Sequence, residues 1–354
     1  MSNQLAVPPD RQDVTKTDVN HSLELIETDG KLPRISQSDY LFLTEVLHGL
    51  SKPNKSLPCK YFYNEAGSKL FEDICELDEY YVTREEKKIL NDVARQLKTL
   101  IPRNVNIIEP GSGAGEKVQI LLNQIDTVKS FTPLEISPSA LAESAERLRL
   151  TFPDLRILPL QGDFTDESTL RSAKNELDIA QNASQHNLLF FPGSTIGNFD
   201  RSDAVKVLNN LAVLIEPAGS LLIGYDLIKN EFKLTRAYDD AKGVTAAFNK
   251  NLLTRINSEL YGTFDVENGF VHSAVYNRMF NRVEMHLVST KDQKATVGGH
   301  TFWFRKGETI HTESSHKYSV ASFTEIAKRA GFSMVQTWTD PDELFAVSLL
   351  RLDS

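Results

Sequence analysis

Three segments with chemically useful side chains each follow a short apolar run in this 354-residue chain. A glycine turn, residues 111–115, follows the first run, and Glu135 ends the second. Asp163 and Phe164 come directly after the third. Glycine carries no Cβ, so a ligand can approach its backbone closely. In a parallel sheet the carboxyl ends of the strands meet at one edge, which is where nucleotide-like ligands bind.

The residues around the glycine turn discriminate between cofactors, although a glycine turn alone is weak evidence. A dinucleotide fingerprint requires a third glycine where this chain has Glu116, and a P-loop requires Gly-Lys-Ser/Thr there. Glu135 suits a ribose diol in either NAD or S-adenosylmethionine (SAM). Asp163 offers a carboxylate to an adenine amino group, and Phe164 offers an aromatic face beside the base. These features favour SAM.

Lys117 adds a cation to the same region. A solvated lysine in the first turn of a helix opposes the helix dipole. We therefore predict that Lys117 pairs with the methionyl carboxylate of the cofactor. The predicted cofactor ligands are Gly111, Gly113, Lys117, Glu135, Asp163 and Phe164.

Alternating strand and helix patterns position these residues. The predicted strands are residues 105–108, 131–136, 156–160, 188–191 and 220–224. The predicted helices include 83–97, opened by a capping box at Thr83, and 117–125, 137–151, 203–215 and 322–329. Two closing strands, 334–339 and 345–350, share a short turn and must be antiparallel. The pattern predicts a doubly wound, mostly parallel α/β sheet of the class I SAM methyltransferase type, the closing hairpin being an analogy at fold level.

The pattern changes after the fifth strand, which predicts a second, smaller α+β domain inserted there. We expect a disordered tail at 1–20, a SAM-binding domain from 44–226 and 318–354, and a substrate-binding domain from 21–43 and 227–317. Within the insert, a helix is expected at 244–253 and strands at 282–288 and 300–304.

Composition excludes several classes of function. The net charge of −9 and the lack of a Lys/Arg-rich run argue against a nucleic-acid partner. No apolar run approaches the roughly 18 residues of a membrane span, and the N-terminal residues have no basic stretch followed by an apolar core, so we expect no secretory signal. Cys59 and Cys75 make neither a disulfide framework nor a zinc site, and the spacings of His300, His311 and His316 fit no metal motif. We expect a cytoplasmic monomer without a metal, acting on a small molecule.

Six stretches resemble one family, the L-histidine Nα-methyltransferases of ergothioneine biosynthesis. They are residues 60–71, 79–84, 192–198, 236–249, 312–315 and 338–341. The resemblance extends over roughly residues 40 to 350, and motifs this long and scattered rarely coincide by chance. Glu135 replaces an aspartate that is common in the family, and Pro110 replaces an aliphatic residue.

The resemblance implies a set of substrate contacts. Asn198 and Tyr238 are expected to hold the histidine carboxylate, with Tyr80 lining the same pocket. Tyr63 and the stretch Glu313, Ser314 and Ser315 are expected to hold the imidazole, with Met285 beside the ring. Tyr63, Asn198 and Tyr238 are the candidate catalytic residues. Taken singly, each of these tyrosines is more often a half-buried packing residue than a ligand, and the resemblance favours the functional roles.

The chemistry of these side chains agrees with the implied roles. Amide and phenol donors suit a carboxylate, and a carboxylate such as Glu313 accepts an imidazole N–H. We therefore predict a SAM-dependent N-methyltransferase that trimethylates the α-amino group of L-histidine to hercynine. The alternatives are methylation of another amino acid, such as tryptophan or a derivative, and a non-catalytic SAM-binding protein. A nicotinamide-dependent dehydrogenase is disfavoured by Glu116.

Overall fold

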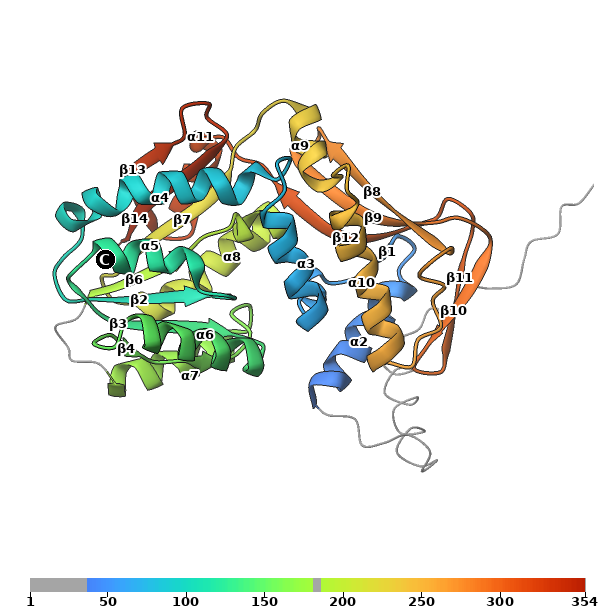
Figure 1. Cartoon of the computed structure of the whole chain (residues 1–354), viewed down its shortest axis with the longest axis horizontal. Coiled ribbons are helices and arrows are strands. Elements are labelled where there is room, and N and C mark those ends of the chain that lie inside the picture. Colours follow the sequence, from blue (N-terminus) through green and yellow to red (C-terminus); the bar gives the residue numbers. More distant parts are fainter. Residues whose placement is uncertain (1–36, 181–185, 354) are drawn as a thin grey trace, which may run out of the picture. The chain divides into compact units, whose positions relative to one another are not determined.

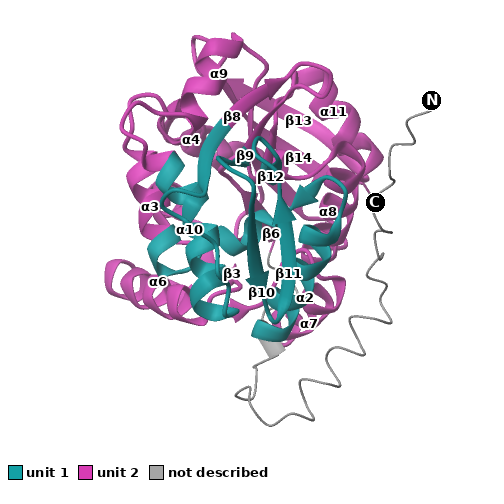
Figure 2. Ribbon diagram, turned by 90° about the vertical axis from the view of Figure 1, so that its right-hand side faces the viewer, with its two compact units in different colours: residues 1–67, 246–273, 286–313 teal, residues 68–245, 274–285, 314–354 magenta. Residues whose placement is uncertain are grey.

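The computed structural model describes residues 37–180 and 186–353, and the chain divides into two compact units (Figures 1 and 2). The first unit takes its described residues from 37–67, 246–273 and 286–313. The second takes them from 68–180, 186–245, 274–285 and 314–353. The tail expected at residues 1–20 lies outside the described residues.

An eight-stranded sheet forms the centre of the second unit, in the order β13-β14-β7-β6-β2-β3-β4, with β5 beside β3. Its strands are β2 (Val105–Pro110), β3 (Val128–Glu135), β4 (Arg156–Ile157), β5 (Leu160–Gln161), β6 (His186–Phe191), β7 (Ser220–Asp226), β13 (Phe332–Thr339) and β14 (Phe345–Leu352). Strands β2 to β7 pair in parallel, whereas β14 is antiparallel to both β7 and β13. The predicted parallel sheet and antiparallel closing hairpin are confirmed, although the strand expected at 156–160 is interrupted.

Continuous burial explains why the central strands contain apolar runs rather than alternating patterns. Every residue of β2 and β7 is buried, which is typical of strands covered on both faces. The helices of this unit are α4 (Tyr81–Leu100), α5 (Glu116–Gln124), α6 (Pro138–Thr151), α7 (Glu167–Ala180), α8 (Arg201–Ala212), α9 (Glu231–Tyr238) and α11 (Val320–Arg329). Leu189, Leu208 and Ile223 belong to one hydrophobic core cluster of buried residues.

The capping box predicted at Thr83 is wrong. Helix α4 already begins at Tyr81, and Thr83 Oγ1 donates to the Cys75 sulfur at 3.2 Å instead of capping the backbone. Glu86, the expected partner in that box, points into the core of the unit. A capping box does occur in α11, where Ser319 and Ser322 exchange side-chain and backbone hydrogen bonds.

The first unit contains α2 (Gln37–Ser51), β1 (Lys55–Ser56), the 3₁₀ helix η1 (Cys59–Phe62), most of α10 (Val244–Glu259), β10 (Gln293–Val297) and β11 (His300–Phe304). A four-stranded sheet, in the order β1-β12-β9-β8, has residues from both units. Its longer strands are β8 (Phe270–Asn277), β9 (Arg282–Ser289) and β12 (Thr309–His316). Helix α3 (Glu65–Cys75) also belongs to both units.

The boundaries of the two compact units differ from those of the predicted domains. Residues 44–67 belong to the first unit, whereas 227–245 belong to the second. The division by function into a cofactor domain and a substrate domain therefore stays a prediction.

Candidate functional site

The glycine turn follows β2 in a left-handed backbone conformation. Gly111, Gly113 and Gly115 have φ angles of 65°, 47° and 65°, which glycine adopts without the steric cost that a Cβ would impose. A Cβ on Gly111 would lie 3.4 Å from the Phe164 ring. The turn and Phe164 are thus direct neighbours at the carboxyl end of the sheet.

Glu135 is the last residue of β3, and Asp163 lies two residues after β5. Glu135 Oε2 accepts a hydrogen bond from Gly113 N at 3.1 Å, so the carboxylate is held against the glycine turn. Asp163 Oδ1 accepts from both the backbone N (2.8 Å) and the hydroxyl (2.6 Å) of Thr165. The structure brings Gly111, Gly113, Glu135 and Phe164 together and places Asp163 directly before that ring.

Two buried polar atoms at the turn have no hydrogen-bond partner among the described residues. They are Glu109 Oε2, at the end of β2, and Ser112 Oγ. Burial raises the pKa of Glu109 well above its usual value, although Lys117 acts in the opposite direction. A cationic ligand would favour the charged form of this carboxyl. The carboxylates and the ring at this turn therefore fit a ligand with an ammonium group, a ribose and a base, as SAM has.

Lys117 lies near the start of α5 and is paired with a residue that the sequence analysis missed. Its Nζ lies 2.6 Å from Glu86 Oε2, and its side chain is only 18% exposed, so it is not a solvated cation. Glu86 also accepts from Gly193 N at 2.9 and 3.0 Å. Burial opposes the charge of Lys117, but the Glu86 carboxylate outweighs this effect and raises the pKa of the lysine. This pair links α4, α5 and the loop after β6.

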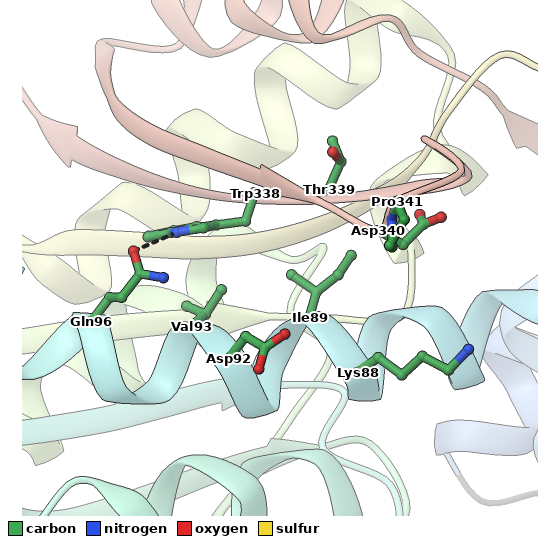
Figure 3. A pocket seen from close by; sticks show the side chains of 9 residues that line it. All are labelled: Lys88, Ile89, Asp92, Val93, Gln96, Trp338, Thr339, Asp340 and Pro341. Atoms are coloured by element: carbon green, nitrogen blue, oxygen red, sulfur yellow. Dashed lines mark hydrogen bonds between the residues drawn. The ribbon is translucent and has the colours of Figure 1, made fainter.

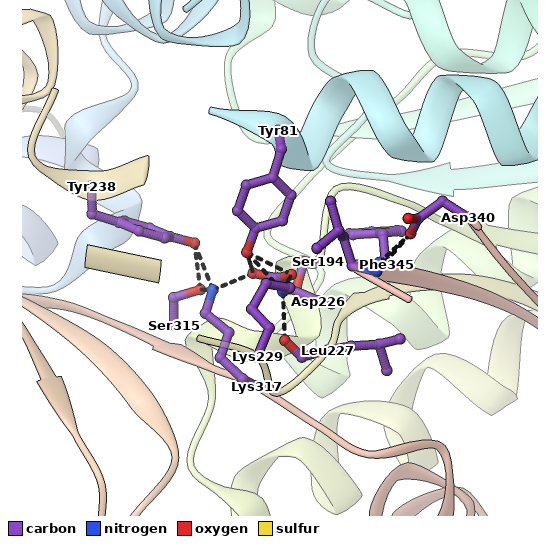
Figure 4. Close-up of polar contacts among 11 residues, drawn as sticks. Tyr81, Ser194, Asp226, Leu227, Lys229, Tyr238, Ser315, Lys317, Asp340 and Phe345 are labelled. Carbon is purple, nitrogen blue, oxygen red and sulfur yellow. Dashed lines mark hydrogen bonds and ion pairs between the residues drawn. The ribbon is translucent and has the colours of Figure 1, made fainter. Parts of the chain in front are cut away.

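Three of the predicted substrate residues meet in the second unit. The rings of Tyr80 and Tyr238 are in edge contact, with centroids 6.1 Å apart. The Tyr238 hydroxyl lies 2.7 Å from Ser315 Oγ (Figure 4). All three side chains are buried. The hydroxyls of Tyr238 and Ser315 therefore lie close together, beside the ring of Tyr80.

Asn198 is positioned by close packing between the loop after β6 and the end of β12. It ends the 3₁₀ helix η2 (Thr195–Asn198) and is half-buried. A Cβ on its neighbour Gly197 would lie 2.9 Å from His316 O, so only glycine allows this approach. Ser314 and Met285, on β12 and β9, are buried as well, at 8% and 2% exposure.

A group of charged residues beneath Tyr238 was not predicted. Lys317 Nζ contacts Tyr238 Oη, Ser315 Oγ and the carboxylate of Asp226, which ends β7 (Figure 4). Asp226 also accepts from Tyr81 Oη and from Lys229. The signal in the sequence is a lysine inside a run of buried residues and a carboxylate at the carboxyl end of a buried strand.

Tyr63 and Glu313 belong to the first unit and are described within it. Tyr63 follows η1, is 37% exposed and makes an edge contact with Phe248 at 5.8 Å. Glu313 is half-buried on β12, whose residues Ile310 and His311 pair with β1. Burial, and then the Glu313 charge, raise the pKa of Cys59 to about 12, so this carboxylate acts on the start of η1.

The histidines and carboxylates of the described residues form no metal site. His316 is buried and contacts Asp200 through Nε2 at 3.0 Å. In residues 37–180 and 186–353, no three His, Cys, Asp or Glu side chains are grouped as a metal site would require. None of the helices described there is both long and apolar enough to span a bilayer.

A cavity of about 250 Å³ lies between α4 and β13 (Figure 3). Trp338 Nε1 donates to Gln96 Oε1 at 2.9 Å along its wall. None of the predicted site residues lines this cavity.

Comparison with known proteins identifies relatives over most of the chain. The histidine N-alpha-methyltransferase of Mycobacterium tuberculosis is 36% identical over 86% of this chain and 93% of its own length. Ergothioneine biosynthesis protein 1 of Neurospora crassa is 31% identical over 82% of this chain and 32% of its own length. A 4-dimethylallyltryptophan N-methyltransferase of Aspergillus fumigatus is 30% identical over 87% of this chain and 93% of its own length. The family model for SAM-dependent, histidine-specific methyltransferases matches residues 42–352, and the chain belongs to this family.

Proposed function

We propose that the protein transfers methyl groups from SAM to the α-amine of L-histidine, up to three times, and so makes hercynine for ergothioneine biosynthesis. One observation of the second unit carries the proposal. The glycine turn after β2, Glu135 after β3 and Asp226 at the end of β7 all lie at carboxyl ends of parallel strands, hence at one edge of the sheet. The Tyr238–Ser315 hydroxyl pair is bound to Asp226 through Lys317.

The cofactor side of this proposal consists of Gly111, Gly113, Lys117, Glu135, Asp163 and Phe164. Glu135 holds the ribose diol, and Asp163 and Phe164 hold the adenine. The buried Glu109 is added here, because its unpaired Oε2 can accept a hydrogen bond from the methionyl ammonium. SAM supplies a methyl group that its sulfonium already activates.

On the substrate side, Asn198 and Tyr238 hold the carboxylate and leave the α-amine directed at the methyl group. Tyr80 lines this part of the pocket. Tyr63, Met285, Glu313, Ser314 and Ser315 bind the imidazole. We keep Tyr63, Asn198 and Tyr238 as the candidate catalytic residues, since they would touch the reacting amino acid.

The chemistry requires alignment and proton removal rather than a nucleophile. Each transfer forms one N–C bond, breaks one S–CH₃ bond and requires an amine that has lost a proton. Holding the amine in line with the methyl group supplies much of the rate. No side chain is assigned as a strong base, so the proton leaves through water, with a tyrosine hydroxyl orienting the amine.

Incubation with SAM and each amino acid, followed by mass spectrometry, tests the reaction. Histidine is expected to gain roughly 14, 28 and 42 mass units, because each transfer adds one CH₂. Methylation of tryptophan or a derivative in place of histidine would establish the alternative substrate. Binding of SAM without any methylated product would indicate a non-catalytic protein.

Replacement of Glu313 by Ala tests the imidazole contact. We expect histidine affinity to fall by on the order of 10- to 100-fold, because a charge-assisted hydrogen bond is lost, while SAM affinity persists. Glu308→Ala is the matched control, since Glu308 is a partly buried carboxylate of the same unit that pairs with Lys55. Calorimetric titration that shows unchanged histidine affinity in Glu313→Ala would exclude the assigned role.

The proposal also includes the division of labour along the chain. The SAM-binding domain comprises 44–226 and 318–354, and the smaller α+β substrate domain comprises 21–43 and 227–317. We propose a cytoplasmic monomer that uses no metal, nucleic-acid or membrane partner. Light scattering of the purified protein tests the monomer.

A further inference from the structure

Lys317 is the most deeply buried cation among the described residues for which an exposure is given. Its side chain is 0% exposed, as is that of Asp226, and the two charged groups are 2.7 Å apart. The other two contacts of the ammonium are Tyr238 Oη at 2.9 Å and Ser315 Oγ at 2.8 Å. An ammonium has three donors, so these three acceptors use all of them.

The backbone fixes Lys317 in this position. Lys317 N donates to Asn281 O at 2.7 Å, and Tyr318 N donates to Asp226 O at 3.0 Å. Leu227 and Tyr318 also form a parallel β-bridge. The segment after β12 is therefore attached to the end of β7, and the lysine has little freedom to point elsewhere.

The hydrogen bonds determine what the Tyr238–Ser315 pair can offer a ligand. Both oxygens accept from Lys317, and the 2.7 Å contact between them uses one of their two protons. The ammonium occupies an acceptor position on each oxygen, so neither hydroxyl directs its proton at Lys317. A hydroxyl held in this way can donate to a carboxylate.

The charges in contact with each other favour the same ligand. Asp226 is the one carboxylate that touches Lys317 and Lys229, whose side chain is 7% exposed. Asp340, the next carboxylate, accepts from the backbone N of Asp342, Leu344 and Phe345. Lys317 is the ammonium of this group that contacts the two hydroxyls, and its burial makes an anion bound beside them favourable.

We propose that Lys317 is a positioning residue for the substrate carboxylate: it fixes the Tyr238 hydroxyl, which Ser315 also contacts, and supplies the positive charge behind it. This inference rests on the proposed function, in which Tyr238 contacts the carboxylate of the amino acid. Lys317 itself does not touch the substrate. It acts through the Tyr238 hydroxyl, so its replacement should weaken mainly the binding of the substrate carboxylate.

Binding measurements on Lys317→Met test this role. We expect the affinity for L-histidine, titrated in the presence of S-adenosylhomocysteine, to fall by on the order of 10- to 100-fold, since hydrogen bonds to a charged group are weakened. Affinity for S-adenosylhomocysteine alone should be kept. L-Histidinamide lacks the carboxylate charge, so it should bind the wild-type protein weakly and the variant almost equally weakly.

Lys229→Met is the matched control. It removes the other ammonium from Asp226 but no contact of Tyr238 or Ser315. Its histidine affinity should stay near that of the wild type, even if its stability falls. Equal losses of histidine affinity in both lysine variants would overturn the positioning role, as would equal losses of histidine and histidinamide in Lys317→Met.

A triple variant covers the case in which Lys317→Met does not fold. Lys317→Gln/Asp226→Asn/Lys229→Met removes all three charges of this group, so that none is left without its partner. It should bind S-adenosylhomocysteine and show the same selective loss for histidine; full histidine affinity in this protein would refute the proposal. If the wild-type protein binds another amino acid instead, the proposed function fails, and the same comparison of acid and amide is made with that amino acid.

Discussion

Glu86 is the side chain whose removal would most clearly separate structural and cofactor-binding effects. It is fully buried in α4, pairs with Lys117 Nζ at 2.6 Å and accepts from Gly193 N. The substitution Glu86→Gln keeps the shape and one acceptor oxygen. It removes the negative charge and places an amide where Lys117 requires an anion.

We expect a large loss of stability because the charge of Lys117, which remains, is mostly buried. Breaking a buried ion pair by changing one partner costs about 3–5 kcal/mol. For a cooperative unit of about 150–250 residues, each kcal/mol lowers Tm by about 2–4 °C, so the expected decrease is roughly 6–20 °C. Glu85→Gln on the same helix is the control. Its partner Lys88 has a side chain that is 61% exposed, so the expected cost is below about 1 kcal/mol.

Thermal unfolding with two ligands completes the experiment. If Lys117 pairs with the methionyl carboxylate, SAM returns an anion to the lysine and should raise Tm more in Glu86→Gln than in the wild type. 5′-Methylthioadenosine lacks the amino-acid part and should show no such excess. An unchanged Tm in Glu86→Gln would refute the ion-pair argument, and equal extra stabilisation by both ligands would refute the assigned contact of Lys117.

Two further predictions concern stability. Burial, opposed by Asp226, lowers the pKa of Lys229 from 10.5 to about 8, so the unfolded chain binds more protons in that window and stability rises with pH there. The difference in free energy of unfolding between wild type and Lys229→Met should therefore grow from pH 8 to 10; a constant difference in urea titrations would contradict the shift. Ser319→Ala removes the capping box of α11 and should cost about 1 kcal/mol, whereas an unchanged urea midpoint would show that the box contributes nothing.

Most of the sheet could be predicted from the sequence because parallel strands covered on both faces contain continuous apolar runs. The runs at β6 and β7 and the closing pair β13 and β14 were recognised in this way. The interruption between β4 and β5 was missed although Pro159 marks it, since proline has no backbone N–H to donate to a neighbouring strand.

Charged residues inside the core account for the missed part of the site. Glu86 occupies the same face of α4 as Ile89, Leu90 and Val93, where all four side chains are buried. A capping-box pattern concealed this position, since Thr83 and Glu86 also have the spacing of a helix start. The partners of Lys317 lie far apart in the sequence, and only tertiary structure brings Asp226, Tyr238 and Ser315 to it. The glycine turn with Glu135 was found because its signal is local.

The position of β14 in the sheet has a consequence for synthesis on the ribosome. This strand pairs with β7 on one side and β13 on the other, although it follows β7 only after both α10 and β12 have been made. Until it emerges, β7 has an open, apolar edge, which is the kind of surface that associates with other chains. The nascent protein therefore depends on late closure by residues 345–352, and shortening this strand would impair solubility before it affected catalysis.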